Sequence, residues 1–597
     1  MMVKIDSNLN RREFMAKALV VGGVLTMQFN LPACATTGSQ DSLADGVAPN
    51  AWIRVSKKDG VIFILDRVEM GQGVISTFPF LIAEELHVLP ENIKIEFAPA
   101  DDAYINKDYR LQITGGSNSL KSSFLPLREA ASSTRLLLEA AAARHWNIKA
   151  EEVETKAGVI HNRKTSDSKP LPFFADLAKG MSVPKPRLTP PDKFVYIGRS
   201  QSRPDNDAKV HGKAEFGIDV KIEGMRTAIL IRPPYFGGRV ESFDATKVLS
   251  SDVEKAVATP HGLALVGRSY WSLREASKSI VIRWSQSEHS KFSSEEFKKQ
   301  LHKSLENDDG KTFGSKGSVE KNFAKARKKV DLTFEMPYLA HATMEPQNCT
   351  VHLTKDSCHI WAPTQSPELA KRAGMRISGL KPENVFVHTT FLGGGFGRRL
   401  TQDYVEEALE IAKATDLPIK LIWSREDDMG HDFYRPLTVH RVQASLDDRN
   451  EIGSWHHKTA GQSILAQMVT DWLPAMSPNC LSERFTAGIS KAAGNLIDSI
   501  SYDQMMIEGA SPIEYRTSAE KLVFQAFKAP VLVGSWRSVG HSYTAFVVES
   551  VIDQLAHEAG EDPVAFRKRL LSEQKRHLGV LTLAAEKSSW GNKVAPI

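Results

Sequence analysis

The chain has 597 residues, of which 42% are hydrophobic and 25% are charged, and its formal net charge is +5. A length of this order corresponds to roughly three or four domains with an extensive hydrophobic core. No Lys/Arg block stands clear of neighbouring acidic residues, so the charge gives no argument for nucleic acid, and small-molecule or protein partners are expected instead.

The N-terminal residues 1–35 have the three parts of an export signal. Arg11 and Arg12 precede an apolar run over 18–29, which leads to the small-residue sequence Ala-Cys-Ala at 33–35. The run is too short to span a bilayer, and the paired arginines resemble the twin-arginine signal, which carries folded proteins. We therefore expect a signal peptide at 1–35, a linker at 36–50 and a periplasmic or membrane-associated protein. An unprocessed amphipathic N-terminus is the alternative, and lipidation at Cys34 is left open.

Short strands and helices alternate along the rest of the chain, as judged from apolar periodicity and from turn residues. The predicted elements are, in chain order, a hairpin around 58–60, helices at 80–86 and 127–146, a boundary at 184–193, a compact α/β unit over 203–286, a polar helical excursion or loop over 287–328, a strand at 385–392, a helix at 404–414 and an amphipathic helix at 555–571.

Three cysteines, Cys349, Cys358 and Cys480, would remain after removal of the leader. An odd and sparse set argues against a disulfide framework, and no CxxC or Cys/His spacing indicates zinc or an iron–sulfur cluster.

The stretch FLGGGFGRRL at 391–400 joins the predicted strand to the predicted helix. Such a junction invites comparison with the dinucleotide fingerprint GxGxxG, but only Gly393 and Gly395 fit, because the third place falls on Arg398. A phosphate-binding P-loop is excluded as well, since no Gly-Lys-Ser/Thr follows. What remains is a backbone that approaches a planar or anionic group closely, with Arg398 or Arg399 available for phosphate. A plain structural turn is the alternative.

Other motifs accompany this loop in a fixed order. They are VEMGQG at 68–73, YLAHATMEP at 338–346, WAPTQ at 361–365, WSREDDM at 423–429, YRP at 434–436 and GSWRSVG at 534–540. Together they resemble the molybdenum-binding subunit of the xanthine dehydrogenase and aldehyde oxidase family. The resemblance runs from about residue 50 to the end, and it is greatest for the large (beta) chain of the isoquinoline 1-oxidoreductases and for related periplasmic aldehyde dehydrogenases.

The resemblance implies an α+β fold of molybdenum-cofactor-binding domains with an inserted α/β hammerhead domain. In xanthine dehydrogenases the EMGQG segment lies late in the chain, whereas here it comes first, which is the permuted order of the isoquinoline oxidoreductase branch. The implied boundaries are 51–190 for the first cofactor-binding segment, 200–290 for the hammerhead, 291–330 for an excursion and 331–597 for the main molybdopterin-binding domains.

The implied cofactor is molybdopterin cytosine dinucleotide, in which the pterin holds the molybdenum, so no protein ligand to the metal is expected. Gln365 and the Gly397 N–H would lie at the apical oxo group. The residues assigned to the cofactor by resemblance are Gly71, Gln72, Gly73, Gly115, Gly116, Ser117, Gln365, Gly395, Phe396, Gly397, Arg398, Trp536, Arg537 and Ser538. For Gln72 and Gln365, an ordinary structural amide is the alternative.

The implied reaction is hydroxylation of an aldehyde or N-heteroaromatic carbon with oxygen from water. Because the chain offers no cluster cysteines, electrons would pass to a small [2Fe–2S] subunit, and from there to a cytochrome c. A cofactor-insertion chaperone is the other implied partner. The identity of the small-molecule substrate stays open.

One departure from the family concerns its general-base glutamate, which lies in a Gly-Val-Gly-Glu-Pro-like segment that residues 1–597 do not contain. The late pair Gly560-Glu561 is followed by Asp-Pro and predicts a turn between two helices instead. We therefore expect a C-terminally truncated relative, and no catalytic residue is assigned. The alternative is a non-catalytic remnant that binds only the cofactor or a partner subunit.

Other charged residues in these motifs are expected to be structural. An ion pair is favoured over a catalytic role for Glu69, and Glu345 is left ambiguous. His341 and His541 are expected to be hydrogen-bonded structural residues, and the acidic run at 426–428 a solvated or helix-capping cluster.

Overall fold

The computed structural model describes residues 46–592, except for Lys107, Gln201 and the segment 477–482. The expected signal peptide, most of the expected linker and Cys480 lie outside the described residues. In the part of the chain that is described, no helix is long and apolar enough to cross a membrane.

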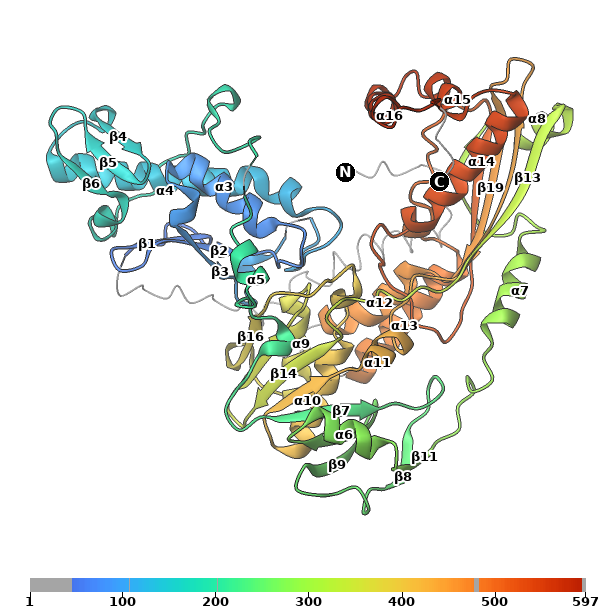
Figure 1. Ribbon diagram of the computed structural model, residues 1–597, viewed down its shortest axis with the longest axis horizontal. Coiled ribbons are helices and arrows are strands. Elements are labelled where there is room, and N and C mark those ends of the chain that lie inside the picture. Colours follow the sequence, from blue (N-terminus) through green and yellow to red (C-terminus); the bar gives the residue numbers. More distant parts are fainter. Residues whose placement is uncertain (1–45, 107, 201, 477–482, 593–597) are drawn as a thin grey trace.

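The N-terminal region packs a small sheet against two helices (Figure 1). Strands β1 (Ile53–Ser56) and β2 (Gly60–Leu65) form the expected hairpin, and β3 (Ile93–Phe97) pairs with β2 in parallel. Helices α3 (Val74–Leu86) and α4 (Ser119–Trp146) confirm both helices expected here, and both are longer than expected. A side sheet follows, made of β4 (Val153–Lys156), β5 (Val159–Asn162) and β6 (Ser168–Pro170).

A seven-stranded sheet forms the centre of the molecule. Its order is β16 (Val385–Thr389), β15 (Cys358–Ala362), β14 (Asn348–Leu353), β17 (Ile419–Ile422), β7 (Arg226–Ile231), β10 (Gly262–Gly267) and β9 (Val253–Thr259). Strand β7 pairs in parallel with β17, so the α/β unit expected at 203–286 has no separate main sheet. The expectation of a compact unit is wrong in this respect, because apolar runs such as β10 are buried by long-range pairing that local periodicity cannot show. Strands β8 (Val240–Asp244) and β11 (Val281–Trp284) form a two-stranded ribbon, while helix α6 (Tyr270–Ser277) packs against β7 and β10.

A five-stranded sheet follows, packed against helix α14 (His541–Ala559). Its order is β12 (Lys311–Lys316), β20 (Glu520–Ala526), β19 (Ile452–Gly461), β18 (Thr438–Leu446) and β13 (Lys328–Met336). The polar stretch at 287–328 contains helices α7 (Ser294–Ser304) and α8 (Val319–Lys325), as expected, but it also supplies strand β12.

The C-terminal helices agree with the turn expected at Gly560-Glu561. Gly560 ends α14 in the left-handed region, and Asp562 caps helix α15 (Pro563–Leu570), which precedes α16 (Lys575–Lys587).

Helices α9 (Pro367–Ser378) and α10 (Asp403–Thr415) cover one face of the central sheet. Ser366 caps α9 by accepting from the Leu369 N–H, and Gly379 ends the helix in the left-handed region. Strands β15 and β16 are parallel, so their carboxyl ends meet at one edge of the sheet. The predicted strand–loop–helix junction at 391–400 is therefore confirmed, and it lies beside the segment that follows β15.

Candidate functional site

Gln365 lies where segments distant in the sequence meet, and it is 2% exposed. Its Nε2 donates to the Thr114 carbonyl oxygen at 2.9 Å, and its Oε1 accepts from the Gly397 N–H at 3.0 Å. An amide nitrogen carries two hydrogens, and in the part of the chain that is described only one of them has an acceptor. One fixed, buried N–H group is therefore left for a ligand.

Thr114 organises this junction, although the residue types alone single out only the Gly115-Gly116-Ser117 that follows it. Its N–H donates to the Gln365 carbonyl oxygen at 2.8 Å, and its Oγ1 accepts from the Val68 N–H at 3.0 Å. Thr114 thus joins the VEMGQG segment to the segment after β15. Its place inside the motif QITGGS is the only signal that could have found it.

The glycines of the 391–400 loop are required by contacts within the protein. A Cβ at Gly395 would lie 2.6 Å from Gln365 Oε1 and 2.7 Å from Met70 Sδ, and one at Gly397 would lie 1.7 Å from the Ser535 carbonyl oxygen. The loop therefore packs directly against the VEMGQG and GSWRSVG segments. Phe396 between these glycines has a φ of 57°, so the turn is sharp at this point.

Three glycines of the other two loops, Gly71, Gly73 and Gly115, face open space instead. A Cβ at Gly71 would meet nothing within 4 Å, and at Gly73 or Gly115 the nearest described atoms would be 3.9 Å away. A ligand can approach the backbone closely there. The N–H groups of Gly71 and Gly73, however, already donate to Glu69 Oε1 at 2.8 and 3.2 Å, so these two glycines offer room and not free donors.

Glu69 is a structural residue, as expected. Its buried carboxylate also accepts from the Ile75 N–H at 3.0 Å and pairs with Arg203 at 3.2 Å. The Gln72 side chain is exposed, but it folds back on the same loop, donating to the Val68 carbonyl and accepting from the Met70 N–H, both at 2.8 Å. For Gln72, the structure therefore agrees with the alternative of an ordinary structural amide.

Arg203 in turn is held by Asp205, in the short helix α5 region (Asn206–Val210). Burial acts to raise the pKa of Asp205, but hydrogen bonds from Arg203 and Lys209 outweigh it and hold the pKa at about 2. The anchor of the VEMGQG loop therefore requires Asp205 to be ionised.

This anchor predicts a specific pH dependence. Because the folded-state pKa of Asp205 lies below its ordinary value of 3.8, the stabilisation is complete above about pH 4 and is lost as the pH falls toward 2. We expect the difference in unfolding free energy between wild type and Asp205→Asn to be constant from pH 7 to 5 and to shrink below pH 4, in urea titrations. The control Asp207→Asn, at an exposed neighbour, should show no such trend; a constant difference down to pH 3 for Asp205→Asn would contradict the prediction.

Arg398 and Arg399 do not have the role expected from the sequence. Both are buried, at 1% and 0% exposure. Arg398 pairs with Asp403 at 2.7 Å and Asp432 at 2.9 Å, while Arg399 donates to the Gly394, Pro363 and Glu345 carbonyl oxygens. The expectation that either guanidinium is available for phosphate is wrong, because carboxylates and carbonyls of the protein already surround them.

Glu345, left ambiguous by the sequence, is structural as well. One carboxylate oxygen accepts from the Gly393 N–H at 2.8 Å and lies 3.2 Å from Arg399, while the other accepts from the Ile218 N–H and the Asn348 side chain. The acidic run behaves similarly, since Asp427 completes a capping box with Ser424 at helix α11 (Arg425–Gly430).

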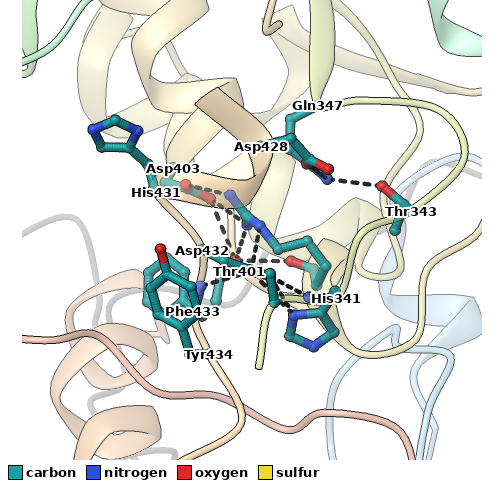
Figure 2. A network of polar contacts seen from close by, with 12 residues as sticks. His341, Thr343, Gln347, Thr401, Asp403, Asp428, His431, Asp432, Phe433 and Tyr434 are labelled. Atoms are coloured by element: carbon teal, nitrogen blue, oxygen red, sulfur yellow. Dashed lines mark hydrogen bonds and ion pairs between the residues drawn. The ribbon is translucent and has the colours of Figure 1, made fainter. Parts of the chain in front are cut away.

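His341 and Asp432 lie side by side in the network of Figure 2. Nδ1 of His341 is 3.0 Å from both carboxylate oxygens of Asp432, and its backbone N–H donates to the same group. Burial acts to raise the pKa of Asp432, but these hydrogen bonds and Arg398 prevail and lower it. His341 is thus hydrogen-bonded, as expected, whereas His541 is more than half exposed, 3.7 Å from Glu508.

The remaining predicted residues surround the same junction or lie at its surface. The Trp536 indole N–H donates to the Ala340 carbonyl oxygen at 3.2 Å, so it is not free for a ligand. Arg537 and Ser538 are exposed and have no hydrogen-bond partner within the described residues. Gly116 and Ser117 are exposed too, with φ values of 60° and 52° in a tight turn over Tyr109.

Comparisons with known proteins identify similar families and relatives. Two family models, each described as a molybdopterin cofactor-binding domain, match residues 11–219 and 301–475. The segment with the EMGQG motif is thus matched separately from the segment with the glycine loop.

Several curated relatives are similar over nearly the whole chain. The beta subunit of isoquinoline 1-oxidoreductase from Brevundimonas diminuta is 27% identical, over 98% of this chain and 78% of that protein. The membrane-bound aldehyde dehydrogenase of Gluconacetobacter polyoxogenes is 24% identical, over 99% and 78%. For a nicotinate dehydrogenase subunit of Pseudomonas putida the identity is 23%, over 93% and 46%.

Solved structures also match. CO dehydrogenase from Oligotropha carboxidovorans superposes with a TM-score of 0.46 at 14% identity, over 66% of this chain and 55% of that one. The chain spans about half the length of this structure and of the nicotinate dehydrogenase subunit.

Proposed function

Because the chain belongs to the molybdopterin-binding family of xanthine dehydrogenases and aldehyde oxidases, we propose that it is the large subunit of a molybdenum hydroxylase. The substrate would be an aldehyde or an N-heteroaromatic compound, hydroxylated with oxygen from water. The observation that carries this proposal is Gln365, whose buried amide keeps one N–H group free where three motif loops meet.

The residues present fit a molybdenum–pterin cofactor. Such a group is long, polar and anionic, and it needs donors and room for close approach. Gln365 supplies a donor, Gly71, Gly73 and Gly115 leave space beside the backbone, and Arg537 offers a cation without a partner in the described structure. In the described residues, no group of three or more His, Cys, Asp or Glu side chains could hold a metal.

When bound, the cofactor would supply the two-electron redox chemistry and the activated oxygen. The chain's own residues would hold and orient it. Thr114 and Gly397 fix both ends of the Gln365 amide, so its free N–H cannot turn away from the ligand. Gly397 and Gly395 allow the loop to pack against Ser535 and Met70, which keeps the Gly397 N–H in contact with the Gln365 amide.

The finer features belong to the same proposal. We propose the cytosine dinucleotide form of the cofactor, a small [2Fe–2S] subunit, a cytochrome c acceptor and a cofactor-insertion chaperone, as the motifs imply. Export by the twin-arginine route to the periplasm would suit a chain that is loaded before transport. Glu69 and Glu345 are both engaged in the fold, so neither is proposed as the general base.

The test is cofactor content. The 597-residue chain, produced in a host that synthesises the molybdenum cofactor, is expected to contain close to one molybdenum per chain and to release one cytosine nucleotide on acid hydrolysis. Production in a host that cannot make the pterin is the control. Absence of both molybdenum and pterin from the folded chain would contradict the proposed function.

Activity separates the enzyme from the alternative. Aldehyde oxidation with a dye acceptor, with the small subunit and a family C-terminal segment supplied in trans, supports the hydroxylase. A loaded chain that stays silent under these conditions, while it still binds the small subunit, supports a binding protein without turnover.

A further inference from the structure

His341 carries a buried nitrogen that the fold does not use. Its side chain is 1% exposed, and Nε2 has no hydrogen-bond partner among the described residues. Nδ1 lies 3.0 Å from both Asp432 carboxylate oxygens, which can only accept, so Nδ1 carries a ring hydrogen. When the ring carries only this hydrogen, Nε2 has a lone pair that can accept one hydrogen bond.

The position of Nε2 relates it to the site. A Cβ built on Gly397 would lie 3.3 Å from it, and Gly397 is the residue whose N–H fixes Gln365. The Trp536 ring lies beside the imidazole, with ring centroids 6.4 Å apart. Nε2 is thus placed where the glycine loop meets the GSWRSVG segment. Buried nitrogens without a hydrogen-bond partner are uncommon in native proteins, so a partner from outside the described residues is expected for Nε2.

The imidazole is held firmly in this orientation. Asp432 also pairs with Arg398 at 2.9 Å, and Arg398 pairs with Asp403 at 2.7 Å and donates to Thr401 at 2.8 Å, so the ring stands at the end of a chain of charged groups (Figure 2). A carboxylate on one ring nitrogen fixes the orientation of the imidazole and leaves the other nitrogen for a partner, as metal-binding histidines illustrate.

We propose that His341 contacts the bound cofactor, with Nε2 accepting a hydrogen bond from an N–H or O–H group of the ligand. Asp432 and Arg398 act as positioning residues that orient the ring. The inference rests on the proposed function, and it goes beyond the structural role that the motif alone suggests. A purely structural histidine would need only Nδ1 and its contact with Asp432.

Two substitutions separate these roles. His341→Asn places a side-chain amide near the position of Nδ1, which preserves the contact with Asp432 and removes Nε2. His341→Gln places an amide near the position of Nε2 and gives up the contact with Asp432. We expect His341→Asn to lose bound cofactor about five to ten times faster than wild type, as for one lost hydrogen bond, and His341→Gln to retain it better than His341→Asn.

The readouts are the molybdenum and pterin that remain bound during dialysis, and the thermal midpoint of each chain with and without cofactor. His302→Asn, on the exposed side of α7, is the matched control and should behave as wild type. The inference is overturned if His341→Asn retains cofactor as wild type does, or if His341→Gln is the weaker of the two. If wild type itself takes up no cofactor, the proposed function fails, and this inference fails with it.

Discussion

Replacing Arg398 by methionine is expected to lower the free energy of unfolding by about 3–5 kcal/mol. The guanidinium is 1% exposed and is the cation between two carboxylates, with Asp403 at 2.7 Å and Asp432 at 2.9 Å. Methionine has a similar volume, but it leaves Asp432 buried without its positive partner. Urea unfolding of the cofactor-free chain, followed by circular dichroism, measures the loss.

The matched control is Arg441→Met. Arg441 pairs with Asp331 at 2.7 Å, but both side chains are about one-third exposed, so the cost should stay below about 1 kcal/mol. If the two substitutions cost the same, Arg398 is not the structural anchor described above, and a role in binding phosphate would have to be considered again.

Among the glycines of the site described above, Gly397 is the position where replacement by alanine is expected to disrupt the site most. The new Cβ would lie 1.7 Å from the Ser535 carbonyl oxygen, and φ at this position is 106°, which side-chain-bearing residues rarely adopt. The glycine loop must then move away from the GSWRSVG segment, and the N–H that fixes Gln365 moves with it. We expect a loss of on the order of 3 kcal/mol in stability and of at least about tenfold in cofactor retention.

Gly579→Ala supplies the comparison. Gly579 lies within α16, and a Cβ there would meet nothing within 4 Å, so the substitution should raise stability by about 0.5–1 kcal/mol. Cofactor retention should stay unchanged. If Gly397→Ala takes up the cofactor as wild type does, the contact between the glycine loop and Gln365 is not what holds the Gln365 amide in place.

The local elements were largely predictable from the sequence. The hairpin of β1 and β2, helix α4 and the strand–loop–helix junction at 391–400 follow from apolar periodicity and turn residues. Strand β12 and the pairing of β7 with β17 were not predictable. The partners of a strand, here β20 and β17, are set by residues distant along the chain.

The site residues also divide into those whose role the sequence predicts and those whose role depends on distant contacts. Gly71 and Gly395 look alike in the sequence, yet one faces open space and the other is packed against Gln365 and Met70. Nothing near Arg398 in the sequence shows that Asp432 lies beside it, so a guanidinium that looked available for phosphate proved to be engaged. Thr114 was missed for the same reason, since its role depends on the position of Gln365.

The contact between Gln365 and Thr114 spans 251 residues of sequence, and that between Gly397 and Ser535 closes a second long loop. Contacts of such separation form late in folding, because the entropy of closing the loops must be overcome first. A chain in which the segment around Thr114, Gln365, Gly397 or Ser535 stays unfolded would therefore lack the site. A cofactor-loading step that recognises the junction would therefore accept only chains in which these distant segments have come together.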